Sequence, residues 1–217
     1  LVLNQIPDFE SPNDYNLDGE YSLTISITDG EYQTNIDLIV VVVNQQEQAE
    51  VTGLTNISLG KQSVTNGNMS AILPNVSLID PDNNYQDHQI IISGLLSEDS
   101  ITLIDNEELE LSFNEDTGDV YFKGMVIAQI DPNNTGVAGS NFLISFNQLA
   151  NNDAVEAVLT SLSYGNNSEQ PTESRTLSII IKDEAGNQLN LYNAVDFLTL
   201  ENNAAPLFNI DVGENAY

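Results

Sequence analysis

The sequence predicts an all-β protein built from β-sandwich modules in tandem, with one short helix. Three observations indicate this fold class. Apolar residues alternate with Ser, Thr, Asn and Gln at the two-residue period of a strand in several stretches. Clusters of Asn, Asp and Gly separate these stretches, as turns separate strands. The pattern of one predicted hairpin also returns near the other end of the chain, as expected of repeated modules.

Residues 21–44 are predicted to form a closing hairpin. In its first strand, apolar side chains at positions 21, 23, 25 and 27 alternate with Ser and Thr. Asp29-Gly30 is expected to turn the chain, because glycine accepts the positive φ of tight hairpin turns. One face of the second strand is expected to carry Tyr32, Ile36, Leu38, Val40 and Val42.

A similar hairpin is predicted from Thr176 onward, with a turn at 184–187 and a second strand at 189–200. Asp29 and Asp183 are 154 residues apart (183 − 29), and Ala49 and Ala205 are 156 apart (205 − 49). These offsets predict a piece of a longer tandem array. Its parts are 1–46, the C-terminal strands of one module; 47–201, a complete β-sandwich module; and 202–217, the first strand of a following module.

A closing hairpin without its opening strands leaves sheet edges unpaired. Residues 1–46 are therefore expected to need further residues to complete their sheet. Pairing with residues 202–217 of an adjacent copy is one hypothesis.

The middle of the chain reads as short strands joined by polar turns. One segment, 151–162, is instead predicted to be a helix, because Asn and Asp can cap its first amides and Val155, Val158, Leu159 and Leu162 fall at helical spacing. The acidic segments 114–119 and 131–136 are interpreted as plain hairpin turns rather than ion sites. The strands are expected at 57–59, 71–79, 89–93, 101–104, 109–113, 119–123, 125–130 and 141–146.

The charge is strongly negative: 33 acidic against 4 basic residues give a net charge of −29. Four cations do not supply the basic surface that nucleic acid requires, and anionic membranes are disfavoured for the same reason. No apolar run is long enough to insert into a membrane. The chain has no cysteine, which excludes disulfides and thiolate metal sites. Ca²⁺ is the natural counterion for acidic, oxygen-rich loops, and an acidic surface adapted to salt is the alternative.

Three stretches resemble the cadherin-like repeats of large bacterial surface adhesins. Pro7-Asp-Phe-Glu10 followed by Tyr21 to Gly30 is similar to the late strands of such a repeat. Asn202 to Phe208, with Val212-Gly-Glu-Asn215, resembles a linker and the first strand of the next repeat. Residues 154–164, 166–168 and 171–179 together resemble a helix-strand segment of giant bacterial adhesins. The resemblance implies cadherin-like or immunoglobulin-like β-sandwich modules.

The resemblance also implies Ca²⁺ ions between consecutive modules. At the first junction the implied ligands are Asp8 and Glu10 from the upstream module, and Asn44 and Glu47 from the linker. The downstream module would add Asp80, Asp82 and Asp183. Asn202 and Asn203 would belong to the second junction, and Glu214 to a junction whose other half lies outside the given sequence. Asp80-Pro81-Asp82 also suits a turn that holds no ion.

The function expected from these features is that of an extracellular, calcium-stabilised spacer at the surface of a bacterial cell, in an adhesin or a filament. Its partners would be neighbouring repeats or copies, with any glycan or protein receptor bound elsewhere in the full-length chain. A glycan-binding or peptide-binding module is the alternative, with its site sought in residues 105–140. No catalytic or organic cofactor site is expected, since His88 is the sole histidine and no serine has a triad around it. A secreted hydrolase that uses a glycosidase-like pair of carboxylates is a third alternative, although nothing in the sequence marks out one pair.

Overall fold

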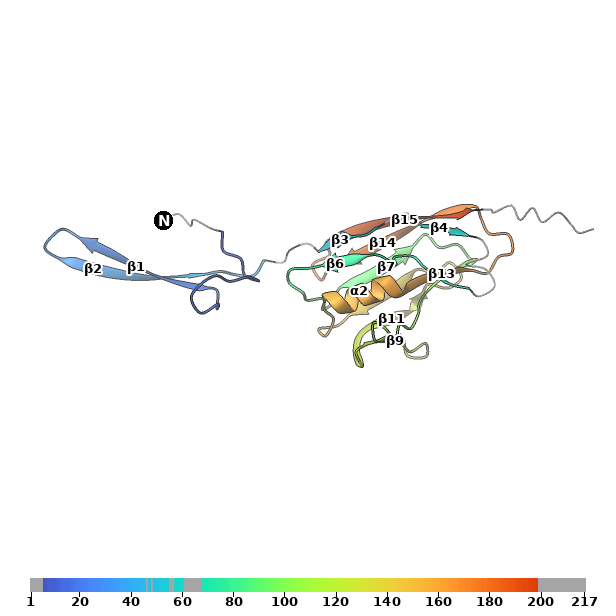
Figure 1. The fold of residues 1–217 in the computed structure, drawn as a ribbon, viewed down its shortest axis with the longest axis horizontal. Helices are drawn as coiled ribbons and strands as arrows, with labels where there is room; N and C mark the ends of the chain where they lie inside the picture. The colour runs from blue at the N-terminus through green and yellow to red at the C-terminus, as the bar shows by residue number, and fades with distance from the viewer. Residues whose placement is uncertain (1–5, 46, 48, 55–56, 61–67, 199–217) are drawn as a thin grey trace, which may run out of the picture.

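The computed structural model describes residues 6–45, 47, 49–54, 57–60 and 68–198. Within these residues the chain is mostly antiparallel β-structure with one α-helix, α2 (Asn152–Ser161). The predicted all-β fold with a short helix is therefore confirmed. A two-stranded hairpin extends from one end of a larger sandwich, and α2 lies on the sandwich (Figure 1).

The hairpin consists of β1 (Glu20–Thr28) and β2 (Gln33–Val41), paired from Glu20 opposite Val41 to Thr28 opposite Gln33. The Asp29 carboxylate accepts backbone N–H bonds from Glu31 and Tyr32 at 2.9 and 2.8 Å, which closes the predicted turn. In the described residues, this pair forms a sheet of its own with no third strand.

The sandwich has one large sheet and two smaller ones. The large sheet consists, in spatial order, of β4 (Ile57–Gly60), β15 (Gln188–Leu198), β14 (Ser174–Lys182), β7 (Gln89–Ser93), β12 (Phe142–Phe146), β11 (Met125–Thr135), β10 (Asp119–Phe122) and β9 (Leu111–Phe113). The smaller sheets are β5 (Ser70–Ala71), β13 (Leu162–Asn166) and β8 (Asp99–Leu103), and the pair β3 (Glu50–Thr52) and β6 (Ser77–Ile79).

The core follows from the alternation that predicted the strands. In β7, β8, β12 and β14, every second side chain is buried. Ile90, Ile144 and Ile179 from the large sheet join Ile101 and Tyr164 from the three-stranded sheet in a single buried cluster. Burial of these side chains is the main stabilising contribution of the fold.

Helix α2 starts where the sequence predicts it. The side chain of Asn151 accepts a hydrogen bond from the backbone N–H of Ala154 at 2.9 Å, which caps the first turn. Val155, Val158 and Leu159 face the core and are fully buried. The capping residue and the spacing of the apolar residues were together sufficient to predict this helix.

Two predictions of local structure are wrong. The strand predicted at 71–79 is two strands, because the chain bends through Pro74 and Asn75 and Val76 N–H donates back to the Leu73 carbonyl at 3.3 Å. Proline has no backbone N–H to donate to a neighbouring strand, so it favours such a break in a strand.

The hairpin turn predicted at 131–136 lies inside strand β11 instead. The pairing of β11 with β12 is irregular between Ile130 and Thr135, and the chain reverses only after Gly136. The Asp131 carboxylate accepts hydrogen bonds from Asn133 N–H and Asn134 Nδ2, which forms a local turn within the strand. The turn predicted at 114–119 is confirmed, since it joins β9 to β10.

A polar network is buried between β8, β13 and β14. Arg175 Nη1 donates to a carboxylate oxygen of Asp99, and the Tyr164 hydroxyl donates to the same oxygen. Asn166 Nδ2 donates to it at 2.8 Å, and Arg175 Nη2 donates to Glu98 at 3.0 Å. Burial, followed by the hydrogen bond to Asp99, raises the pKa of Tyr164.

Candidate functional site

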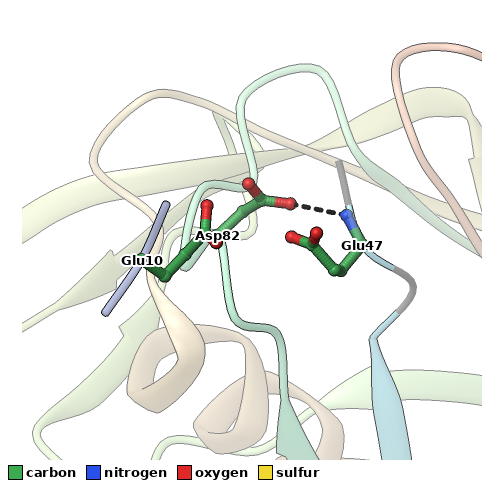
Figure 2. A group of neighbouring side chains, drawn as sticks. All are labelled: Glu10, Glu47 and Asp82. Carbon is green, nitrogen blue, oxygen red and sulfur yellow. Dashed lines mark hydrogen bonds between the residues drawn. The ribbon is translucent and has the colours of Figure 1, made fainter. Parts of the chain in front are cut away.

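Three carboxylates meet where the hairpin joins the sandwich. Glu10 precedes β1, Glu47 lies in the linker after β2, and Asp82 follows β6. One side-chain oxygen from each lies within 4.8 Å of the other two. Figure 2 shows the three side chains turned toward one another. The structure thus brings together acidic groups from three separate segments of the chain.

The Asp82 side is held by the sandwich. Asp82 N–H donates to Asp80 Oδ1 at 3.0 Å, and Asp80 N–H donates to the side chain of Asn152 at 2.9 Å. Asn152 Nδ2 donates in return to the Asp80 carbonyl at 3.0 Å. Because Asn152 is the first residue of α2, the helix fixes the acidic loop, and the Asp80 side chain is buried as the turn's internal acceptor.

The linker is tied to this loop by one hydrogen bond. The backbone N–H of Glu47 donates to Asp82 Oδ2 at 3.0 Å (Figure 2). On the hairpin side, Asp8 Oδ1 accepts N–H bonds from Glu10 and Ser11 at 3.0 and 3.1 Å. These Asx-type bonds set the direction in which the Glu10 backbone leaves Asp8.

The cluster is electrostatically unfavourable as it stands. Partial desolvation raises the pKa of the Glu47 carboxyl. The negative charges of Glu10, Asp82 and Asp8 raise it further. Burial raises the pKa of the Asp80 carboxyl, and the charge of Asp82 adds to that effect. The ion pairs of the described residues all involve Arg175, far along the chain. A bound cation would relieve the repulsion, and carboxylate oxygens are the donors that a hard cation prefers.

A cavity of about 330 Å³ lies beside the cluster. It contains both Glu47 and Asp80 in its wall, together with Asp183 from the turn between β14 and β15. Each oxygen of the Asp183 carboxylate accepts one hydrogen bond, from Asn187 N–H at 2.7 Å and from Asn187 Nδ2 at 2.6 Å. The other residues that line the cavity are Ala49, His88, Ile181, Asn187, Gln188 and Leu189.

Two further implied ligands of the first junction, Asn44 and Asp8, lie within the described residues. Asn44 is exposed in the linker. Asp8 contributes charge beside Glu47 and is not one of the three carboxylates. Asn202, Asn203 and Glu214 lie outside the described residues.

The sequence interpretation overlooked a second acidic loop. Asp14, Asn16 and Asp18 are followed by Gly19, a D-x-N-x-D-G spacing that matches the first half of an EF-hand-type calcium loop and could have been found. The Asp14 carboxylate accepts backbone N–H bonds from Asn16, Asp18 and Gly19 at 3.1, 3.2 and 2.8 Å. Partial desolvation of the Asp14 carboxyl acts to raise its pKa. The backbone N–H donors act in the opposite direction, and together they hold the pKa of Asp14 below its usual value. The loop is thus a closed backbone turn around one carboxylate.

His88 is a packing residue in this structure. Its side chain is buried beside the cavity, and its ring meets the ring of Tyr85 edge to face, with 5.2 Å between centroids. His88 Nδ1 lies 3.2 Å from the Gln86 carbonyl.

Comparisons with known proteins give little further guidance. No family model matches the chain, and no curated protein matches it. Among solved structures, the chain is similar at 15% identity to the crystal structure of the S-layer protein SbsC domains 4 and 5, with a TM-score of 0.26. The match covers 81% of this chain, and the chain spans 58% of the length of that structure's chain. A likeness at this level assigns neither a family nor a function. No helix in the described residues has the length and apolar character needed to cross a bilayer.

Proposed function

We propose that this chain is a calcium-stabilised repeat module, an extracellular structural spacer in an adhesin or filament at the surface of a bacterial cell. The observation that supports it is the meeting of Glu10, Glu47 and Asp82 at the junction between hairpin and sandwich. Carboxylates on both sides of a linker and within it are placed to bind a shared cation.

The donor set suits Ca²⁺. This ion takes six to eight oxygen ligands at flexible geometry, and Glu10, Glu47 and Asp82 offer only oxygen donors. Asp8 and Asn44 lie in the same segments and are candidates for further ligands. The Asp80 carboxylate orients Asp82 by accepting a hydrogen bond from the backbone N–H of Asp82. Ca²⁺ would neutralise the mutual repulsion of the three carboxylates and so lower the free energy of the closed junction.

The mechanical consequence concerns the linker. The described linker residues 42–45, 47 and 49 lie outside any strand, so the hydrogen bond from Glu47 to Asp82 is a weak restraint by itself. A cation shared by Glu10, Glu47 and Asp82 would restrain the hairpin side and the sandwich side together. A spacer needs this stiffness to hold distant parts of an array apart.

The composition bears on which crosslink could stabilise such a module. A net charge of −29 and the absence of cysteine leave ion binding, rather than disulfides, as the crosslink available to a surface protein. The partners in this proposal are neighbouring repeats or copies of the same protein, without nucleic acid and without insertion into a membrane. The proposal includes no catalytic role.

The test is calorimetric titration of the chelator-treated chain with Ca²⁺, with thermal melting and small-angle scattering in both states. We expect saturable binding, a higher melting temperature and a narrower distribution of hairpin orientations with calcium. Asp82→Asn and Glu47→Gln should each weaken binding by roughly tenfold or more, since affinity follows the number of charged ligands. Glu115→Gln, an exposed carboxylate in the turn between β9 and β10, is the matched control and should bind as the parent does.

Identical melting and scattering with calcium and with chelator would contradict the proposal. The acidity would then be that of a salt-adapted surface, and the melting temperature should instead rise with NaCl concentration, irrespective of calcium.

A second candidate function is favoured by a cavity of about 480 Å³ within the segment where a ligand site is expected. Phe113, Ile130 and Phe142 line it together with the acidic side chains of Glu115, Asp116 and Asp131. Glycans and peptides both bind to such mixed surfaces. A glycan-array or peptide-array signal that Asp131→Asn and Val137→Ser both abolish would support this alternative, and silent arrays would remove it.

A further inference from the structure

The peptide bond between Asp80 and Pro81 lies in the acidic loop that joins β6 to β7. Proline has no backbone N–H, so its nitrogen cannot attack the aspartate carboxyl to form a succinimide. The aspartate carboxylate can instead attack its own carbonyl carbon, because the proline nitrogen of a tertiary amide is displaced more readily than an ordinary amide nitrogen. The chain has a second bond of this type, between Asp131 and Pro132.

The Asp80 carbonyl oxygen accepts two hydrogen bonds. The backbone N–H of Asn83 donates to it at 3.1 Å, and Asn152 Nδ2 donates to it at 3.0 Å. A carbonyl oxygen gains negative charge when its carbon is attacked, and two N–H donors aimed at that oxygen stabilise the charge, as in the oxyanion hole of an acyl-transfer enzyme. The loop and helix α2 thus each supply one donor to this bond.

The direction of the Asn152 amide is set by its other end. Asn152 Oδ1 accepts the backbone N–H of Asp80 at 2.9 Å and the Tyr85 hydroxyl at 2.7 Å. Tyr85 is fully buried, and burial raises the pKa of its hydroxyl, which therefore keeps the proton that it donates. With both of these donors on Oδ1, Asn152 has to turn Nδ2 toward the Asp80 carbonyl.

The attacking group is held in the same turn. Asp80 Oδ1 accepts the backbone N–H of Asp82 at 3.0 Å, which folds the carboxylate back along the backbone of the turn. A nucleophile held beside its target reacts far faster than one that rotates freely. Asp80 is 3% exposed and lines the cavity of about 330 Å³ beside the junction. That cavity has room for the water that cleavage consumes.

We propose that the folded protein cleaves its own chain between Asp80 and Pro81. A carboxylate oxygen of Asp80 forms a bond to the Asp80 carbonyl carbon, and the bond from that carbon to the Pro81 nitrogen breaks. The nitrogen takes a proton from water and leaves as a new amino terminus, while Asp80 becomes a cyclic anhydride. The hydroxide that remains opens the anhydride. The net reaction consumes one water molecule and leaves Asp80 with two carboxyl groups.

The two products should stay assembled after the cut. Ile72, Leu73 and Leu78 precede the cleaved bond and are buried in the core that the rest of the sandwich completes. The reaction uses only protein atoms and water. It therefore goes beyond the calcium proposal and does not depend on a bound ion.

The test incubates the full chain with chelator just below its melting temperature, and in parallel in guanidinium chloride, until the unfolded chain is measurably cut. Denaturing mass spectrometry quantifies the products that end at Asp80 and at Asp131. The bond after Asp131 is the internal reference, because that carboxylate also accepts the N–H two residues on, from Asn133 at 2.8 Å. Asp80→Asn removes the carboxylate. Asn152→Asp replaces the donor Nδ2 with an oxygen.

We expect cleavage after Asp80 to exceed cleavage after Asp131 by at least about tenfold in the folded chain, since each donor to a developing oxyanion contributes a factor of this size or more. The two bonds should break at similar, slow rates in guanidinium chloride. Asp80→Asn should not be cut at this position. Asn152→Asp should be cut at least about tenfold more slowly than the parent, with its melting curve showing that it is folded.

Equal cleavage after Asp80 and Asp131 in the folded parent would overturn the inference, and this comparison needs no variant. A folded parent that stays intact while the unfolded chain is cut would overturn it as well. A cut that persists in Asp80→Asn would show that a protease is the agent, and an undiminished rate in folded Asn152→Asp would exclude the oxyanion donor. Calcium titration is a separate measurement, so either proposal can fail without the other.

Discussion

The guanidinium of Arg175 and the carboxylate of Asp99 form an ion pair inside the sandwich, with both side chains almost completely buried. Asp99 lies on β8 and Arg175 on β14, so the pair joins the two facing sheets. A buried charge that loses its partner is costly, because water no longer solvates it.

Replacing Arg175 with methionine should therefore destabilise the protein by about 3–5 kcal/mol, since Asp99 would remain buried without its cation. The double variant Arg175→Met/Asp99→Leu should recover part of this loss, because both charges are then absent. Urea unfolding of the parent and the variants measures the difference. Equal losses in the single and double variants would show that the packing of the arginine side chain, rather than its charge, is what matters.

The acidic junction should make the calcium-free protein sensitive to pH. Asp80 has its pKa raised above 3.8 and Glu47 above 4.5 in the folded state. An acid with a raised pKa in the folded state supports stability below its unfolded value, and this support is lost as pH rises through the folded value. In chelator, Asp80→Asn should thus gain stability relative to the parent as pH rises above 3.8.

Urea unfolding of the parent and Asp80→Asn between pH 3 and roughly 7 checks this expectation, since the linkage gives the slope of stability with pH. Asparagine keeps an oxygen that can accept the Asp82 N–H, so the turn should survive. Glu115→Gln is the control for the loss of one surface charge. A parent that becomes the more stable protein toward neutral pH would contradict the expected sign.

Gly94 is expected to be intolerant of any side chain. Its φ is +92°, and a Cβ there would lie 2.3 Å from the Thr176 carbonyl oxygen. Gly124 also has a positive φ, +76°, but a Cβ at that position meets no other atom within 4 Å. Gly124→Ala should cost only about 1–2 kcal/mol for the left-handed backbone. Gly94→Ala should cost about 1–3 kcal/mol more for the steric clash.

Thermal or denaturant unfolding of the two glycine variants gives this comparison directly. Similar losses in both would mean that the strands β7 and β14 can separate slightly at Thr176 without cost.

The cap of α2 should contribute measurably to stability. Asn151→Ala removes the acceptor for the Ala154 N–H and should destabilise the protein by about 1 kcal/mol, whereas Asn151→Ser should cost less. Chemical denaturation of the three proteins checks the order. An alanine variant as stable as the parent would indicate that water or another group replaces the cap.

The sequence predicted the elements whose signal is local. The apolar run with Leu177, Ile179 and Ile181 on one face, between Thr176 and Lys182, marks β14, and Asn151 with its helical apolar spacing marks α2. The two wrong predictions arose where local signals compete. Pro74 interrupted a run that reads as one strand, and Asp131 with its amide neighbours formed a turn that tertiary pairing kept inside a strand.

The arrangement of the candidate site could not be predicted from the sequence. The resemblance named Glu10, Glu47 and Asp82 together with Asp8, Asp80 and Asp183, and the structure places oxygens of only the first three within 4.8 Å of one another. Nothing in the sequence shows that Asn187 donates a hydrogen bond to each oxygen of Asp183, because these bonds depend on the shape of the turn between β14 and β15. The Asp99–Arg175 pair was likewise unpredictable, since it requires strands from two sheets to face one another.

The parallel pairing of β4 with β15 determines how the sandwich carries load. The chain enters the module before β4 and leaves it after β15, and the two strands run in the same direction. Tension applied along the chain would pull β4 backward and β15 forward, so the two strands would slide past one another. After the β3–β6 pair, all hydrogen bonds of that ladder would then resist together in shear instead of opening one at a time, so this short edge strand would oppose such tension.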